Sequence, residues 1–226
     1  MSYYPIFLDL TRKKALVVGG GLVAQRKVET LLKYGALISL VSLELTGRLQ
    51  EMAAEKTIQY LGHEFREAHL EGMFLVIAAT DDPALNHRVS LQAQKRGLLI
   101  NAVDQPEDCN FIVPSILRRG NLQVAISTSG KSPALARKIR KDMELQFGEE
   151  YEKLLNLMGI VRKEILSRGM SQEANKRIFM EIIASDILEA LAREDRERVA
   201  NILQCAVGRE IPLASVVDRI MESEEM

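Results

Sequence analysis

Short apolar runs alternate with amphipathic stretches over the first half of the chain. The apolar runs predict buried strands at residues 16–18, 37–41, 58–61, 74–79 and 98–103. Three of the stretches between them repeat apolar positions at helical spacing, and they predict helices that end near residues 34, 55 and 96. This alternation predicts an α/β fold built on a doubly wound parallel sheet with right-handed crossovers.

The second half of the chain follows a different pattern. Residues 116–119 and 122–128 predict a hairpin around Gly120 and Asn121. Ser132 and Pro133 predict the N-cap and first turn of a helix. We expect this helix to bury the face that carries Leu135, Ile139, Met143 and Phe147.

Helical periodicity alone continues from residue 149. The segment 167–169 and Pro212 are expected to divide it into about four helices. We therefore expect three parts, a sheet domain over residues 1–113, a small α+β segment over 114–148 and an all-helical domain over 149–226.

Three glycines lie between the first predicted strand and the first predicted helix. Gly19 permits a tight turn, Gly21 lets the backbone approach a pyrophosphate, and Ala24 lets the helix pack closely on the strand. The diphosphate would sit at the helix N-terminus, as in Rossmann-like dinucleotide-binding domains. The alternative is a glycine-rich turn that only joins two elements.

The second predicted strand closes without the acidic residue that commonly binds the adenosine ribose there. Glu44 lies slightly late for that role, so Ser42 or backbone groups at Leu43 are alternatives. No arginine immediately follows this strand, which favours NAD over NADP.

Polar residues also follow two later strands. Thr80 and Asp81 are candidates to approach the cofactor, although the same stretch suits a helix N-cap followed by Pro83, and both interpretations can hold. Asp104 and its neighbour Val103 end the fifth strand, where a carboxylate close to the expected nicotinamide can exchange protons with a substrate. The alternative is that Asp104 is an ordinary turn residue.

The segment between Cys109 and Lys141 contains no acidic residue and seven basic ones. A solvated basic helix is one interpretation, and a site for a carboxylate-rich small molecule is the other. The candidate substrate-binding residues are Arg118, Arg119, Ser129, Lys131, Ser132 and Arg137.

Composition narrows the classes of function. A net charge of −1 argues against a general nucleic-acid binder, and no apolar run approaches a membrane span. The two cysteines lie far apart, and the three histidines lack metal-ligand spacing, so we expect neither a disulfide nor a metal site. The N-terminus lacks a basic region, which favours a cytoplasmic protein without a signal peptide. His63 and His69 are expected in solvated loops, and His87 within a helix.

Six motifs occur in order over residues 1 to about 145. They are Pro5-Ile6-Phe7-Leu8, Val17-Val18-Gly19-Gly20-Gly21-x-Val23-Ala24-x-Arg26-Lys27, Ala78-Ala79-Thr80-Asp81-Asp82, Asn101-x-Val103-Asp104, Phe111-Ile112-x-Pro114-Ser115-Ile116 and Ser129-Gly130-Lys131-Ser132-Pro133-x-Leu135-Ala136-Arg137. Together these motifs resemble the signature of the precorrin-2 dehydrogenases, the siroheme-synthase family.

The resemblance implies NAD-dependent oxidation of precorrin-2 to sirohydrochlorin and, in some relatives, insertion of Fe²⁺ to give siroheme. It implies a homodimer in which the basic middle segment is the dimerisation region and helps to shape a cleft. It places the family's essential aspartate on Asp104 and the NAD contacts on Gly21, Leu22, Val23, Leu43 and Glu44. We expect no methyltransferase module, and the resemblance leaves open whether this chain inserts iron.

Two other classes of function stay open at this point. An NAD(H)-sensing regulatory module would use the same fold without catalysis, since a dinucleotide fold does not by itself imply chemistry. An unrelated dehydrogenase acting on a small acid would have to explain the seven clustered bases and the lack of an evident catalytic histidine.

Overall fold

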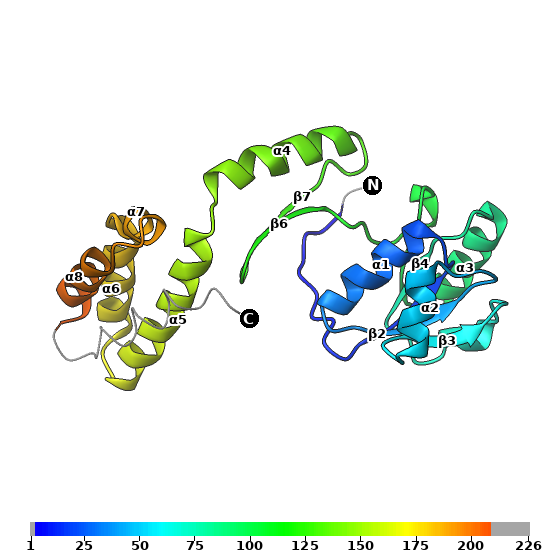
Figure 1. Cartoon of the computed structure of the whole chain (residues 1–226), viewed down its shortest axis with the longest axis horizontal. Helices are drawn as coiled ribbons and strands as arrows, with labels where there is room; N and C mark the ends of the chain where they lie inside the picture. The colour runs from blue at the N-terminus through cyan, green and yellow to red at the C-terminus, as the bar shows by residue number, and fades with distance from the viewer. Residues whose placement is uncertain (1–2, 209–226) are drawn as a thin grey trace. The chain divides into compact units, whose positions relative to one another are not determined.

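The computed structural model describes residues 3–208, and the chain divides into two compact units, Met1–Val113 and Pro114–Met226 (Figure 1). The two units are described separately below.

The first unit is built on a parallel sheet of five strands. Its order is β3-β2-β1-β4-β5, so the chain starts in the middle of the sheet and reverses direction once, which confirms the predicted doubly wound fold. The strands are mostly apolar because both faces of the sheet are covered. They are β1 (Lys14–Val18), β2 (Leu37–Val41), β3 (Gln59–Gly62), β4 (Leu75–Ala78) and β5 (Leu99–Ala102).

Side chains that alternate along β1 enter two separate cores. Ala15 and Val17 pack with residues of α1 (Leu22–Lys33) and α2 (Gly47–Ala54). Leu16 and Val18 pack on the other face, in a core that includes residues of α3 (Pro83–Lys95) and the short 3-10 helix η1 (Glu67–Leu70). A second 3-10 helix, η2 (Pro106–Asp108), follows β5.

This strand order determines where a ligand can bind. Strand β1 lies between β2 and β4, and α1, which follows β1, packs on one face of the sheet, whereas α3, which follows β4, packs on the other. A crevice opens at such a switch point, outside the carboxyl ends of the strands.

The second unit begins with the predicted hairpin. Strands β6 (Ser115–Arg119) and β7 (Leu122–Ile126) pair antiparallel around Gly120, whose φ is +51°. The strand β7 ends before the predicted residue 128, and helix α4 (Pro133–Gln146) begins after Ser132, which caps it by accepting a hydrogen bond from Leu135 N at 3.2 Å.

The prediction that α4 buries an apolar face is wrong for the single chain. Leu135 is 48% exposed, Ile139, Met143 and Phe147 are only half-buried, and Ala136 is the one buried residue of the helix. The two-stranded hairpin covers only part of α4, so this apolar face stays partly exposed.

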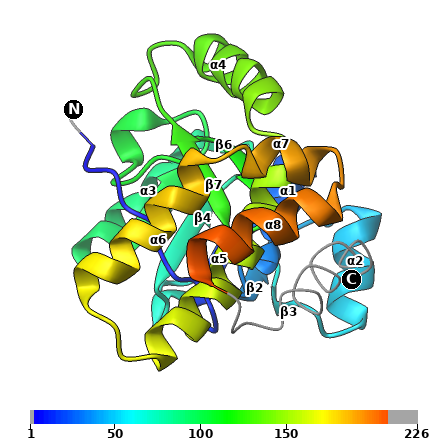
Figure 2. The ribbon, with the colours of Figure 1, turned by 90° about the vertical axis from the view of Figure 1, so that its left-hand side faces the viewer.

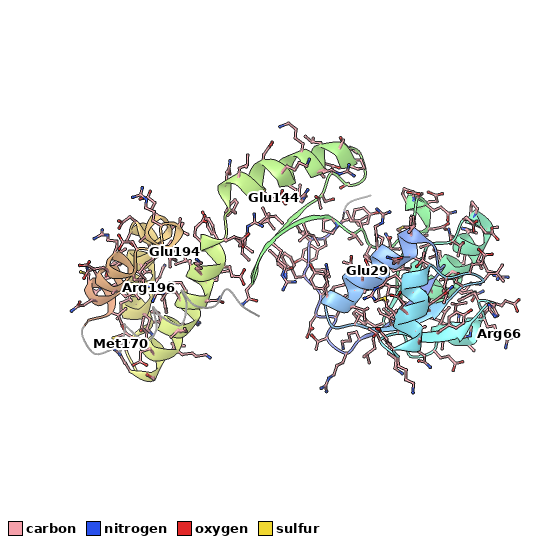
Figure 3. All side chains as sticks on the ribbon, in the orientation of Figure 1. Glu29, Arg66, Glu144, Met170, Glu194 and Arg196 are labelled. Atoms are coloured by element: carbon pink, nitrogen blue, oxygen red, sulfur yellow. The ribbon has the colours of Figure 1, made fainter. Side chains whose placement is uncertain are left out.

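Up to residue 208, where the description of the chain ends, four helices follow α4, and they form a bundle (Figure 2). They are α5 (Glu150–Ser167), α6 (Gln172–Ala184), α7 (Ile187–Ala192) and α8 (Arg196–Val207). Leu157, Ile182 and Leu203 are among the side chains of their shared core, and Lys153 pairs at 2.8 Å with Glu194, which is labelled in Figure 3. The predicted break at residues 167–169 coincides with the end of α5, whereas Pro212 lies outside the described residues. None of the helices within residues 3–208 has the length and apolar character needed to cross a membrane.

Candidate functional site

A cleft of about 1070 Å³ lies at the carboxyl end of the parallel sheet, and all of its lining residues belong to the first unit. It brings together all the residues that the sequence indicates for cofactor binding and proton transfer. These are Gly19, Gly21, Leu22, Val23, Ser42, Leu43, Glu44, Thr80, Asp81, Val103 and Asp104.

The three glycines of the turn differ in the space around them. A Cβ on Gly19, whose φ is +118°, would lie 2.2 Å from Ala79 O, and one on Gly20 would lie 2.0 Å from Glu44 O. A Cβ on Gly21 would meet nothing within 4 Å. The first two glycines are therefore required by the packing of the protein itself, whereas Gly21 leaves open space in the cleft.

The start of α1 is suited to an anion. Gly21 is its N-cap, no side chain caps the first backbone amides, and no acidic residue lies in the first turn. Unpaired amides and the positive end of the helix dipole at such a position bind phosphate groups. The chain thus fits the diphosphate of a dinucleotide at this position.

The loop after β2 is held firmly against the glycine turn. Thr46 N donates to Gly20 O at 3.0 Å, and Ser42 Oγ donates to Glu44 O at 2.7 Å. The Glu44 side chain is exposed, and its carboxylate has no hydrogen-bond or ion-pair partner among the described residues. The backbone of this loop is fixed, and the carboxylate is available to a ligand.

His63 is a cleft residue that the sequence did not indicate. It is exposed, as expected, but it lines the cleft beside the residues that follow β2. Its Nδ1 lies 3.0 Å from Tyr60 Oη and 3.3 Å from Leu43 O. His69, by contrast, is half-buried within η1 rather than in an open loop, and its Nδ1 accepts from Arg66 N.

The end of β4 satisfies both interpretations of its sequence. Asp82 caps α3 by accepting from Ala84 N at 2.9 Å, and Thr80 and Asp81 line the cleft. Asn86, which also lines the cleft, fixes Thr80 by donating to its carbonyl at 3.0 Å and accepting from its hydroxyl at 2.8 Å.

Asp104 is exposed at the end of β5 in a left-handed backbone conformation, with φ +60°. Aspartate tolerates this region better than most residues, and such conformations concentrate at functional sites. The thiol of Cys109 holds the surrounding loop, because its Sγ lies 3.2 Å from both the amide and the carbonyl of Ala102 and 3.3 Å from Gln105 O.

Burial raises the pKa of the Cys109 thiol, so the S–H remains a donor for these carbonyls. Burial also lowers the pKa of Lys27 on α1, and the nearby positive charge of Arg26 lowers it further. Cys109 and Asp104 act in the opposite direction and raise the pKa of Lys27. Lys27 thus lies within electrostatic reach of the Asp104 loop.

The six candidate substrate-binding residues belong to the second unit. Arg119 is largely committed to protein contacts, with Nε 3.3 Å from Glu149 Oε1 and Nη2 donating to the carbonyl of Glu144, which is labelled in Figure 3. The hydroxyl of Ser132 serves as a helix cap. Arg118 donates to Gly120 O at 3.0 Å, and Ser129, Lys131 and Arg137 are exposed.

Metal ligands are not clustered in the part of the chain that the structure describes. Residues 3–208 contain no group of three or more His, Cys, Asp or Glu side chains placed to hold a metal ion.

The sheet order, the glycine turn and the uncapped α1 terminus define a Rossmann-like dinucleotide-binding domain. Residues 6–115 match a family model described as putative NAD(P)-binding, and residues 119–145 match the model of the sirohaem biosynthesis protein central region. Together these two matches make the chain similar to NAD(P)-binding proteins of sirohaem biosynthesis.

Individual relatives agree with this similarity. The chain is 42% identical over 181 residues to a siroheme synthase of Photorhabdus laumondii, covering 80% of this chain and 38% of that protein. It is 38% identical over 208 residues to a siroheme synthase of Sodalis glossinidius, covering 92% of this chain and 44% of the relative. The chain therefore spans less than half the length of these curated relatives.

A solved structure is similar over nearly its whole length. The structure named SirC, precorrin-2 dehydrogenase, has a TM-score of 0.76 and 28% sequence identity to this chain. The similarity covers 90% of this chain and 98% of that one. It extends beyond the sheet domain into the helical part of the chain.

Proposed function

We propose that this chain is an NAD-dependent oxidoreductase that converts precorrin-2 to sirohydrochlorin in siroheme biosynthesis. The observation that carries the proposal is the position of Asp104, an exposed carboxylate that lines the same cleft as the glycine turn. The names of the siroheme synthases and of the precorrin-2 dehydrogenase that the chain resembles support the choice of substrate.

The cofactor in this proposal is NAD, whose nicotinamide ring accepts the hydride. Gly21, Leu22 and Val23 hold the diphosphate at the start of α1, and Leu43 and Glu44 contact the adenosine side. The residues that line the described cleft include no lysine or arginine to neutralise the additional phosphate of NADP.

Asp104 acts as the base in this mechanism. Loss of a hydride leaves a proton on the substrate to be removed, and a carboxylate within hydrogen-bond reach of that proton can accept it. The fixed loop around Asp104 keeps the carboxylate at the cleft, which reduces the entropy lost when the substrate is aligned.

The basic segment supplies the attraction for the substrate. Its bases, which include Arg118, Lys131 and Arg137, complement a tetrapyrrole rich in carboxylates, and Ser129 and Ser132 offer hydroxyl groups beside them. Arg119 would contribute mainly charge, because its guanidinium already contacts Glu149.

We also propose that the chain forms a homodimer through residues 114–148. Along the sequence this dimerisation segment follows the domain 1–113 and precedes the domain 149–226. The open apolar face of α4, with Leu135 48% exposed, supports it. Sedimentation should give a dimer for the wild-type chain and a shift to monomer for Leu135→Glu. A wild-type monomer at micromolar concentration would contradict this part.

Iron insertion is a second activity to test. Chelation also removes protons, from pyrrole nitrogens, so Asp104 can serve both reactions with Fe²⁺ as a substrate. Incubation of the chain with sirohydrochlorin and Fe²⁺ in the absence of NAD should give the siroheme spectrum, and no change above the rate without protein would remove this activity.

We place the reactions in the cytoplasm, where Cys109 and Cys205 would stay reduced.

The main experiment combines the chain with precorrin-2 and NAD under anaerobic conditions. We expect NADH and sirohydrochlorin to form in equal amounts, as followed by absorbance. If NAD binds but neither product forms and no tetrapyrrole binds, the chain is better described as an NAD(H)-sensing module.

A further inference from the structure

The end of β3 forms the edge of the cleft next to the expected ribose position. Ser42, the first residue after β2, donates its backbone N–H to Gly62 O at 3.1 Å, which ties the ends of β2 and β3 together. His63 follows directly and lines the cleft with Ser42 and Leu43. In this fold the residue at the end of the second strand meets the adenosine ribose, so His63 borders the same place.

The contacts of His63 indicate a proton on Nδ1. Nδ1 lies 3.3 Å from Leu43 O and 3.0 Å from Tyr60 Oη, and Tyr60 Oη lies 2.9 Å from Ser42 O. Because carbonyl oxygens only accept, Tyr60 donates its hydroxyl proton to Ser42 O and His63 Nδ1–H donates toward Leu43 O and Tyr60 Oη. A ring that carries its proton on Nδ1 alone presents Nε2 as an acceptor.

The charge of the cleft favours the same kind of ligand group. Its described lining contains the carboxylates of Glu44, Asp81, Asp82 and Asp104, and His63 is its one basic side chain. An acceptor nitrogen near Glu44 suits a hydroxyl group that donates, and the exposed Glu44 carboxylate disfavours a phosphate dianion at this position, away from the start of α1.

We propose that His63 accepts a hydrogen bond from the 2′-hydroxyl of the adenosine ribose through Nε2 and thereby selects NAD over NADP. The inference rests on the proposed function only in requiring that the cleft binds a dinucleotide. Tyr60 is the positioning residue, because its hydroxyl holds the imidazole in this orientation and tautomer.

Two substitutions separate the two ring nitrogens. The amide of His63→Asn can replace Nδ1 opposite Leu43 O but has nothing at the Nε2 position, whereas the longer His63→Gln places an amide oxygen near Nε2. The probes are adenosine 5′-monophosphate and adenosine 2′,5′-bisphosphate, titrated by calorimetry without substrate. The loss of one hydrogen bond should weaken monophosphate binding about tenfold in His63→Asn, and His63→Gln should recover most of it.

A third substitution tests the selectivity. His63→Lys places a cation at the same position and should raise the affinity for the bisphosphate relative to the monophosphate by about tenfold. The adjacent exposed Glu64, which does not line the cleft, provides the control Glu64→Gln, with both affinities as in the wild type.

The outcomes separate this inference from the proposed function. If the wild type binds the monophosphate and His63→Asn binds it equally well, or if His63→Lys leaves the ratio of the two affinities unchanged, the role of His63 is wrong and the cofactor site stands. If the wild type binds neither nucleotide nor NAD, both the inference and the proposed cofactor are wrong.

Discussion

Replacing Gly21 by alanine tests whether the open space at the start of α1 is reserved for a ligand. Gly21 has φ −78° and ψ −175°, which any residue adopts, and an added Cβ meets nothing within 4 Å. Alanine is a poorer N-cap than glycine, but it also restricts the unfolded chain. Since these effects oppose each other, we expect the free energy of unfolding to change by less than about 0.5 kcal/mol.

The effect on the cofactor should be far larger. An N–H···O bond to a diphosphate brings the oxygen to about 2.9 Å from the backbone nitrogen, and the new methyl group would occupy part of that space. Losing one or two hydrogen bonds to a charged group costs about 3 kcal/mol. We therefore expect the Kd for NAD to rise about a hundredfold, as measured by calorimetry.

Gly20→Ala is the matched comparison in the same turn. Its Cβ would lie 2.0 Å from Glu44 O and 2.7 Å from Ser42 Oγ, so the backbone must shift. We expect it to lower the free energy of unfolding in urea by about 1–3 kcal/mol. Wild-type affinity for NAD in Gly21→Ala, or equal destabilisation by the two substitutions, would refute the reasoning from space around these glycines.

Two further predictions concern the cysteines. Cys109→Ala removes the thiol that holds the Asp104 loop. We expect turnover to fall about tenfold to a hundredfold, while the Kd for NAD stays unchanged. An unchanged turnover would show that the loop keeps its conformation without the thiol. In the native wild-type chain, alkylation should modify the exposed Cys205 rapidly and Cys109 slowly, because burial raises the pKa of the Cys109 thiol and its S–H is hydrogen-bonded. Equal rates at the two thiols, as followed by mass spectrometry of digested peptides, would contradict this.

Local sequence signals were sufficient for the fold and for much of the cleft. Apolar runs separated by helical periodicity define the parallel sheet, and in a parallel sheet the residues that follow each strand meet at one edge. For this reason Gly21, Glu44 and Asp104 could be expected in one cleft without any knowledge of tertiary contacts.

Other features depend on neighbours that are distant in sequence. His63 becomes a cleft residue because β3 pairs with β2 and brings it beside Leu43. Asn86 belongs to the site because it lies on α3 and its side chain holds Thr80 in place. Cys109 gives no local signal of its contact with Ala102. The sequence pattern of α4 correctly indicates an apolar face. It cannot predict how much of that face the hairpin covers, and Leu135 stays exposed.

Asp104→Asn tests the central claim most directly. Asparagine has nearly the same shape and also tolerates a positive φ, so the loop should be retained while the base is lost. In a single turnover with precorrin-2 and excess NAD, we expect NADH formation to slow by about a hundredfold or more. The Kd for NAD should stay within about twofold of the wild type, because Asp104 makes no contact with the diphosphate in this account. Oxidation of precorrin-2 by Asp104→Asn at the wild-type rate would contradict the account.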